Sequence, residues 1–125
     1  MKANKYVVLL IDDDDDFLEA LNVLVQSWGY KTVTAGSAEA GLKKHKAAPA
    51  DLIIVDLMME EVDAGAQFVK ELKLLGSATP VFLLSGAGDS MSTGVDYTKL
   101  GFSGVFQKPI DAIRLLNVLK AKLPG

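Results

Sequence analysis

The sequence predicts a doubly wound α/β domain, in which helices cover both faces of a parallel sheet. Short runs rich in β-branched and aliphatic residues recur along the whole chain and alternate with segments of helical spacing. The five runs are Tyr6–Ile11, Lys31–Ala35, Leu52–Val55, Val81–Leu84 and Gly104–Phe106. As a group they lack the inside–outside alternation of half-exposed strands, which indicates burial on both faces. Five strand–helix repeats with right-handed crossovers then favour one doubly wound sheet.

Apolar residues at three- and four-residue steps predict the helices that lie between these runs. The three stripes consist of Phe17, Leu21, Leu24 and Trp28, then Phe68, Leu72 and Leu75, and finally Ile113, Leu116, Leu119 and Leu123. Gly29 and Gly76 follow the first two stripes, where glycine commonly ends a helix. In the last helix, Val118 falls outside the apolar stripe and is a candidate for contact with a partner.

A further helix is predicted to begin after Ser37, because serine is a favoured N-terminal cap and Glu39 then lies in the first turn. This helix runs toward His45, which stands among polar residues and is interpreted as a surface residue. The weakest helical pattern is that of Ser90–Leu100, which contains Gly94 and few apolar residues.

The length and composition exclude several classes of protein. The chain has 125 residues, half of them apolar, no cysteine and a net charge of −3 with scattered basic residues. Disulfides, thiolate metal sites and a nucleic-acid-binding face are therefore not expected. The first apolar stretch, Tyr6–Ile11, is too short for a signal peptide or a membrane span. We expect one cytoplasmic domain spanning residues 1–125, without membrane insertion or direct binding to nucleic acid.

Acidic, hydroxyl and basic side chains follow the predicted strands at their carboxyl ends. The acidic run Asp12–Asp16 follows the first strand, Asp56 the third, Ser85 the fourth, and Lys108 with Pro109 the fifth. In a doubly wound sheet, ligands bind outside the carboxyl ends of the strands. The sequence therefore predicts a functional site at this edge of the sheet.

These residue types together suit the transfer of a phosphoryl group. Two carboxylates about 4 Å apart repel by about 4 kcal/mol at an effective dielectric constant near 20, and a divalent cation relieves that repulsion. Oxygen ligands favour Mg²⁺ or Mn²⁺. A neighbouring carboxylate such as Asp56 can attack phosphorus and form an acyl phosphate. The Lys108 ammonium and the Ser85 hydroxyl would then stabilise the transferred oxygens.

Each of these residues alone also has a purely structural explanation. Asp12–Asp16 is compatible with a solvated loop before a helix whose N-terminus favours negative charge. Asp56 and Ser85 are common turn residues, and Lys108 is compatible with an exposed lysine before the helix-starting Pro109. The functional interpretation rests on their joint position at the carboxyl ends of the strands.

Several segments resemble the receiver domains of response regulators, in the family's order and over nearly the whole chain. They are Leu10–Leu18, which contains the acidic pair; Asp51–Met59, which contains the phosphoacceptor aspartate; Thr79–Gly86, with the switch hydroxyl; Lys99–Phe102; and Gln107–Pro109. The resemblance implies a chemotaxis-regulator-like (βα)5 flavodoxin-like fold. It also implies a five-stranded parallel sheet in the order 2-1-3-4-5, two helices on one face, three on the other, and a cis Lys108–Pro109 peptide bond.

The resemblance also implies the roles of individual residues. Asp56 would be the phosphoryl acceptor, Ser85 would bind the phosphoryl group and move toward it, and Lys108 would pair with it. Asp13 and Asp56 would bind Mg²⁺ or Mn²⁺ directly, Asp12 through a water molecule, and Met58 through its backbone carbonyl. The donor would be a sensor histidine kinase or a histidine phosphotransfer protein. The signal would pass to a downstream protein through the face formed by the helix at Ser90–Leu100, the fifth strand and the last helix.

Three departures from the family pattern bear on this interpretation. Glu60–Ala64 replaces the usual loop that contains a proline, and its acids could alter metal affinity. Val105 stands where the family commonly has an aromatic switch residue, and Phe106 should point to the opposite face. The polar helix at Ser90–Leu100 suggests a mobile output face.

Two other functions therefore stay open. A receiver-like interaction module would work without phosphorylation. A phosphatase of the haloacid-dehalogenase type would use Asp12 and Asp14, but such enzymes need a further acidic motif well downstream of the lysine, and this sequence ends soon after Lys108. On the receiver interpretation the protein is not an enzyme in the usual sense, because it would catalyse only its own phosphorylation and dephosphorylation.

Overall fold

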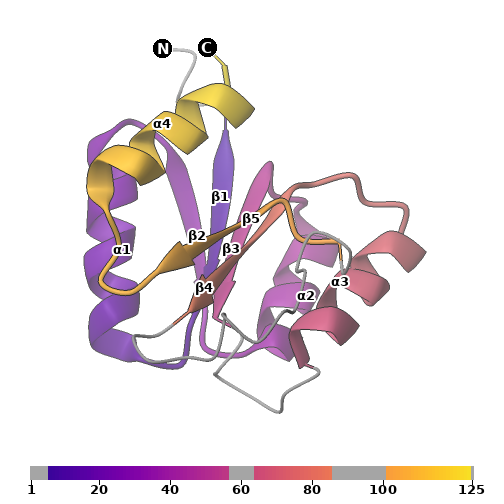
Figure 1. The fold of residues 1–125 in the computed structure, drawn as a ribbon. Helices are drawn as coiled ribbons and strands as arrows, with labels where there is room; N and C mark the ends of the chain where they lie inside the picture. The colour runs from indigo at the N-terminus through magenta and orange to yellow at the C-terminus, as the bar shows by residue number, and fades with distance from the viewer. Residues whose placement is uncertain (1–5, 57–63, 86–100, 125) are drawn as a thin grey trace, which may run out of the picture.

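A five-stranded parallel sheet forms the centre of the molecule (Figure 1). The computed structural model describes residues 6–56, 64–85 and 101–124. The strands are β1 (Val7–Ile11), β2 (Lys31–Ala35), β3 (Leu52–Asp56), β4 (Val81–Ser85) and β5 (Gly104–Gln107). They pair in the order β2-β1-β3-β4-β5, so the predicted fold and strand order are confirmed.

Four helices among the described residues cover the two faces of this sheet. They are α1 (Asp15–Ser27), α2 (Ala38–Ala47), α3 (Ala64–Leu74) and α4 (Ala112–Lys122). In Figure 1, α1 and α4 lie on one side of the sheet, and α2 and α3 lie on the other. The helix expected at Ser90–Leu100 lies outside the described residues, so the count of three helices on one face stays a prediction.

The sheet separates two hydrophobic clusters, because successive residues of each strand point to opposite faces. Val8 and Leu10 of β1 pack with residues of α1 and α4 in one cluster. Leu9 and Ile11 of the same strand pack with residues of α2 and α3 in the other. Strands β3 and β4 are buried along their whole length, as expected for strands covered on both faces.

The helix boundaries follow local signals in the sequence. Asp14 caps α1 and accepts a hydrogen bond from the backbone N–H of Phe17, and Ser37 caps α2 and accepts one from Ala40. Gly29 and Gly76 have φ angles of 95° and 77°, a left-handed conformation that glycine adopts without steric cost. The predicted cap at Ser37 and the two predicted terminating glycines are therefore confirmed.

The apolar stripe predicted for the last helix is partly wrong. Ile113 is 74% exposed, whereas Leu115 and Leu119 are fully buried. Val118 is half-buried and packs against the core, so it does not stand apart as a contact for a partner. A second apolar stripe of this helix consists of Leu115, Val118 and Leu119, and it shares Leu119 with the predicted stripe. This second stripe is the one that faces the sheet.

His45 is buried, at 3% exposure, which contradicts its interpretation as a surface residue. Its Nδ1 accepts a hydrogen bond from the backbone N–H of Ala50 at 3.0 Å, and its Nε2 lies 3.2 Å from Ser77 Oγ. Because Nδ1 is an acceptor, the proton of the neutral ring lies on Nε2 and can be donated to Ser77. The last turn of α2 is thereby joined to the segment before β3 and to the connection between α3 and β4.

Burial lowers the pKa of His45, so the folded protein should lose stability as the pH falls. The unfolded chain takes up the proton near pH 6.5, before the folded chain does, and proton uptake therefore favours unfolding below that pH. Relative to His45→Asn, whose side-chain oxygen can still accept from Ala50, the wild-type free energy of unfolding should fall by up to about 1.4 kcal/mol per pH unit below pH 6.5. Urea denaturation from pH 7.5 to 5 measures this, and parallel curves for the two proteins would refute it.

The described residues contain no helix that is both long enough and apolar enough to span a membrane.

Candidate functional site

Four strands bring the predicted site residues to one edge of the sheet. Asp12 directly follows β1, Asp56 and Ser85 end β3 and β4, and Lys108 directly follows β5. Asp12, Asp56 and Ser85 are all at least nine-tenths buried. The Lys108 backbone N–H donates to the Ser85 carbonyl at 2.8 Å, which joins the ends of β4 and β5. The expected convergence of acidic, hydroxyl and basic residues is therefore present.

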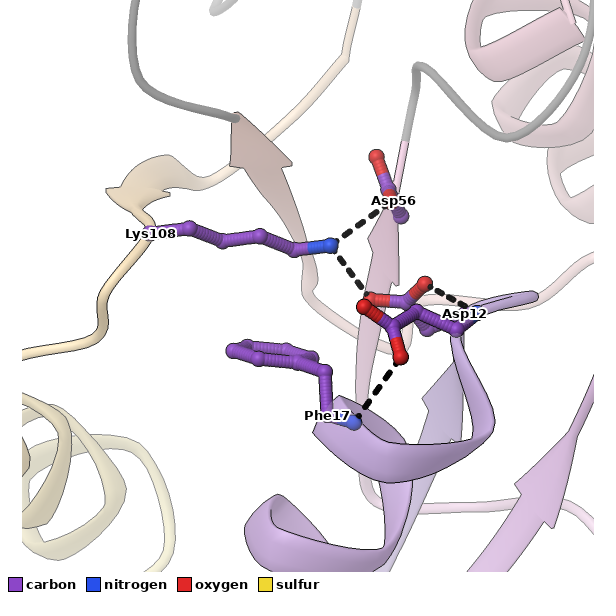
Figure 2. Close-up of polar contacts among 5 residues, drawn as sticks. Asp12, Phe17, Asp56 and Lys108 are labelled. Carbon is purple, nitrogen blue, oxygen red and sulfur yellow. Dashed lines mark hydrogen bonds and ion pairs between the residues drawn. The ribbon is translucent and has the colours of Figure 1, made fainter.

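Lys108 bridges the two buried carboxylates, as Figure 2 shows. Its Nζ lies 2.8 Å from Asp12 Oδ2 and donates a hydrogen bond to Asp56 Oδ2 at 3.0 Å. The Lys108 side chain is 21% exposed, and those of Asp12 and Asp56 are 1% and 7% exposed. The low exposure strengthens the electrostatic attraction, because little water screens these three charges.

The pKa shifts of Asp12 and Lys108 reflect this shared environment. Burial raises the pKa of Asp12, and the negative charge of Asp56 adds to this, although Lys108 and the Asp14 N–H oppose it. Burial alone would lower the pKa of Lys108, but its contacts with Asp12 and Asp56 outweigh burial and raise it. Lys108 therefore stays protonated and positively charged beside the two carboxylates.

Three carboxylates lie close enough together to bind one cation. Ligand oxygens of Asp12, Asp13 and Asp56 all lie within 4.8 Å of one another, and Asp13 faces the solvent. Asp12 Oδ1 accepts from the Asp14 N–H at 2.9 Å, while the buried Asp12 Oδ2 accepts no hydrogen bond of good geometry within the described part of the chain. An oxygen-only donor set with one open side fits Mg²⁺ or Mn²⁺. The backbone carbonyl of Met58 lies outside the described residues.

Local backbone contacts hold the acidic residues in place. The Asp12 N–H donates to the Ala35 carbonyl at 3.1 Å, which extends the pairing of β1 with β2 by one residue. Two residues later, Asp14 begins α1 as its cap. Asp12 is therefore fixed both by the sheet and by the start of a helix, and this limits the freedom of its carboxylate.

The end of β5 agrees with two predictions. The Lys108–Pro109 peptide bond is cis. Val105 packs against the cluster beneath α2 and α3, whereas Phe106 belongs to the cluster beneath α1 and α4. Arg114 of α4 donates to the Val105 carbonyl at 2.8 Å, and its guanidinium carbon lies 4.7 Å from the centre of the Phe106 ring. The two neighbouring side chains therefore have different surroundings. The loop at Glu60–Asp63 lies outside the described residues.

Sequence reasoning missed the role of Phe17, which it treated only as a core residue. The Lys108 ammonium lies 4.3 Å from the centre of the Phe17 ring (Figure 2). The sequence analysis also did not identify Asp14 as the one of five consecutive aspartates that caps α1. A signal was available, because an aromatic residue directly after the acidic run had to lie in the first turn of a helix beside the strand ends.

Comparison with known proteins places the chain in a family. Residues 8–120 match the model of the response regulator receiver domain. The chain is 36% identical over 112 residues to the transcriptional regulatory protein GlrR of Escherichia coli, and these cover 90% of the chain and 25% of GlrR. It is 33% identical over 123 residues to the response regulator protein TodT of Pseudomonas putida, with 98% of the chain and 53% of TodT covered. The chain thus spans between about a quarter and about half the length of these relatives.

Solved structures agree with this placement. The chemotaxis protein CheY4 of Vibrio cholerae superposes with a TM-score of 0.80 at 28% identity, over 94% of this chain and 98% of that one. The receiver domain of NtrX from Brucella abortus superposes with a TM-score of 0.81 at 26% identity, over 93% and 97% of the two chains. Together with the matched residues and the strand order, these similarities show that the chain belongs to the receiver domains of response regulators in two-component signalling.

Proposed function

We propose that this receiver domain accepts a phosphoryl group on Asp56 from a phosphohistidine of a sensor kinase or of a phosphotransfer protein. The observation that carries the proposal is the Lys108 ammonium, which lies within hydrogen-bond distance of Asp56 at the edge where Asp12 and Asp13 converge. We assign the receiver domain to residues 1–125 and place it in the cytoplasm. The domain would catalyse only its own phosphorylation and dephosphorylation, and its downstream partner would be another protein.

In the proposed reaction, a carboxylate oxygen of Asp56 attacks phosphorus and forms a new O–P bond. The P–N bond of the donor breaks, and its electron pair stays on the histidine nitrogen. Lys108 is already beside Asp56 and neutralises negative charge on the transferred oxygens. Ser85 ends the neighbouring strand, and its hydroxyl would donate a hydrogen bond to one of these oxygens.

The acidic residues would hold the cofactor. Asp13 and Asp56 would bind Mg²⁺ or Mn²⁺ directly, Asp12 through a water molecule, and Met58 through its carbonyl. When bound, the cation supplies positive charge beside the transferred oxygens and relieves the repulsion among the three carboxylates. The oxygen Asp12 Oδ2 is buried, and the positive charge beside it in this structure is the Lys108 ammonium.

A phosphorylation assay tests this function. The protein is incubated with Mg²⁺ and acetyl phosphate or phosphoramidate, and its intact mass is recorded with and without EDTA. We expect a gain of one phosphoryl group with Mg²⁺ and none with EDTA. Reduction by borohydride, which converts an aspartyl phosphate to homoserine, should label the peptide that contains Asp56. No mass gain with any donor would refute the proposal and favour an interaction module that works without phosphorylation.

A further inference from the structure

The Phe17 ring lies beside the Lys108 ammonium. The ammonium lies 4.3 Å from the ring centre, well within the range of a cation–π contact. In Figure 2 the ring of Phe17 lies beneath the lysine side chain, on the side of Lys108 away from Asp56. The carboxylates of Asp12 and Asp56 are its other neighbours. Among the described residues, Lys108 thus contacts two carboxylates and one aromatic ring.

The position of the Phe17 ring is fixed by the start of α1. Asp14 Oδ1 accepts a hydrogen bond from the Phe17 N–H at 3.1 Å, which holds Phe17 as the third residue of the helix. The ring is half-buried and packs against the hydrophobic cluster beneath α1 and α4. The Phe17 backbone is therefore held at the start of α1 and its ring packs against the core, whereas the four-carbon stem of lysine is flexible.

An aromatic ring differs from the two carboxylates in one chemical respect. It attracts the ammonium through the negative face of its π system but carries no net charge. It can therefore hold Lys108 near Asp56 without competing strongly with transferred phosphoryl oxygens for the ammonium. We propose that Phe17 is a positioning residue for Lys108, and that its ring holds the ammonium over Asp56 during phosphoryl transfer. The part of this inference that concerns transfer rests on the proposed phosphorylation of Asp56.

Fluorinated phenylalanines test the inference with little change of shape. Mono-, di- and trifluorophenylalanine are incorporated at residue 17, and each fluorine withdraws electron density from the face of the ring. The rate constant for phosphorylation by phosphoramidate should fall stepwise, by roughly two- to fivefold for the trifluoro ring. The same series at Phe68, buried in the cluster beneath α2 and α3, is the control and should leave the rate unchanged. A rate that does not depend on fluorination at residue 17 would overturn the inference.

A second readout does not require phosphorylation. The urea midpoint of unfolding should fall along the series at residue 17 by about 0.3–0.5 M, and it should not fall when the series is placed in a Lys108→Met background. An equal fall of the midpoint along the series with and without Lys108 would show that the ring does not hold the ammonium, and would overturn the inference even if Asp56 is phosphorylated. A dependence on Lys108 without any phosphorylation would support the contact and refute the proposed function instead.

Discussion

Replacing Asp56 by asparagine is expected to abolish the gain of one phosphoryl group. The amide oxygen of asparagine carries no charge and is a poor nucleophile, so no acyl phosphate can form at this position. Loss of a nucleophile should reduce the rate by roughly a thousandfold or more, which is below detection in an intact-mass assay. The measurement is the mass of Asp56→Asn after incubation with acetyl phosphate and Mg²⁺, beside the wild type.

A matched control makes the same chemical change at the other end of β3. Asp51 precedes the strand, is exposed, and accepts a hydrogen bond from the Val7 N–H at 2.8 Å. An asparagine oxygen can also accept this bond, so Asp51→Asn should fold and be phosphorylated at the wild-type rate. If Asp56→Asn still gained a phosphoryl group at that rate, the acceptor would have to be a different residue, and the role assigned to Asp56 would be wrong.

Phe106→Ala should cause the largest loss of stability among side-chain truncations in β5. Phe106 is 1% exposed and its ring centre lies 5.4 Å from that of Phe82. The Arg114 guanidinium covers the ring as well. Removal of a buried aromatic ring typically costs about 3–5 kcal/mol, a large part of the roughly 5–15 kcal/mol that stabilises a domain. Urea denaturation followed by circular dichroism measures the loss.

Val105→Ala, a truncation at the residue before Phe106 in the same strand, is the control for Phe106→Ala. Val105 is only half-buried and lies against the cluster on the opposite face of the sheet. Its truncation removes two partly buried carbon atoms and should cost about 1 kcal/mol. Equal losses for the two variants would contradict the different packing of their side chains.

The five strands could be predicted from the sequence because local composition dominates there, whereas their order was implied by the resemblance to receiver domains. The strands β3 and β4 are buried on both faces, and apart from Asp56 and Ser85 at their carboxyl ends they consist of the apolar residues that such an environment favours. Helix ends were predictable where one residue type is strongly favoured, as for Ser37 and for Gly29 with its positive φ angle.

The orientation of single helical residues was harder to predict. The apolar residues of α4 allow two stripes, and only contact with the sheet selects Leu115 rather than Ile113 for the core. His45 was misplaced because its neighbours in sequence are polar, whereas its burial depends on Ala50 and Ser77, which approach it through the fold. A histidine with both ring nitrogens in hydrogen bonds can be buried at low cost, and sequence spacing does not reveal those partners.

The site itself was more predictable than its surroundings. Parallel strands place their carboxyl ends at one edge, so Asp12, Asp56 and Lys108 could be expected together at that edge, and the structure brings their charged groups into contact. The acidic run places Phe17 near the strand ends, but its contact with Lys108 depends also on the rotation of α1 and on the reach of the lysine stem. Neither of these quantities can be read from residue spacing.

The division of the hydrophobic interior by the sheet has a consequence for how this molecule can diverge. The cluster beneath α1 and α4 and the cluster beneath α2 and α3 share no side chain, although both are anchored on the same strands. A change in packing on one side, such as at Leu119, is therefore separated from Leu72 on the other by the full thickness of the sheet. Effects of substitutions that are far apart and share no partners are close to additive. Substitutions can therefore accumulate in one cluster without changing the packing of the other. The surface over one cluster can adapt to a new binding partner while the other cluster keeps the strands, and so the acidic residues at their ends, in place.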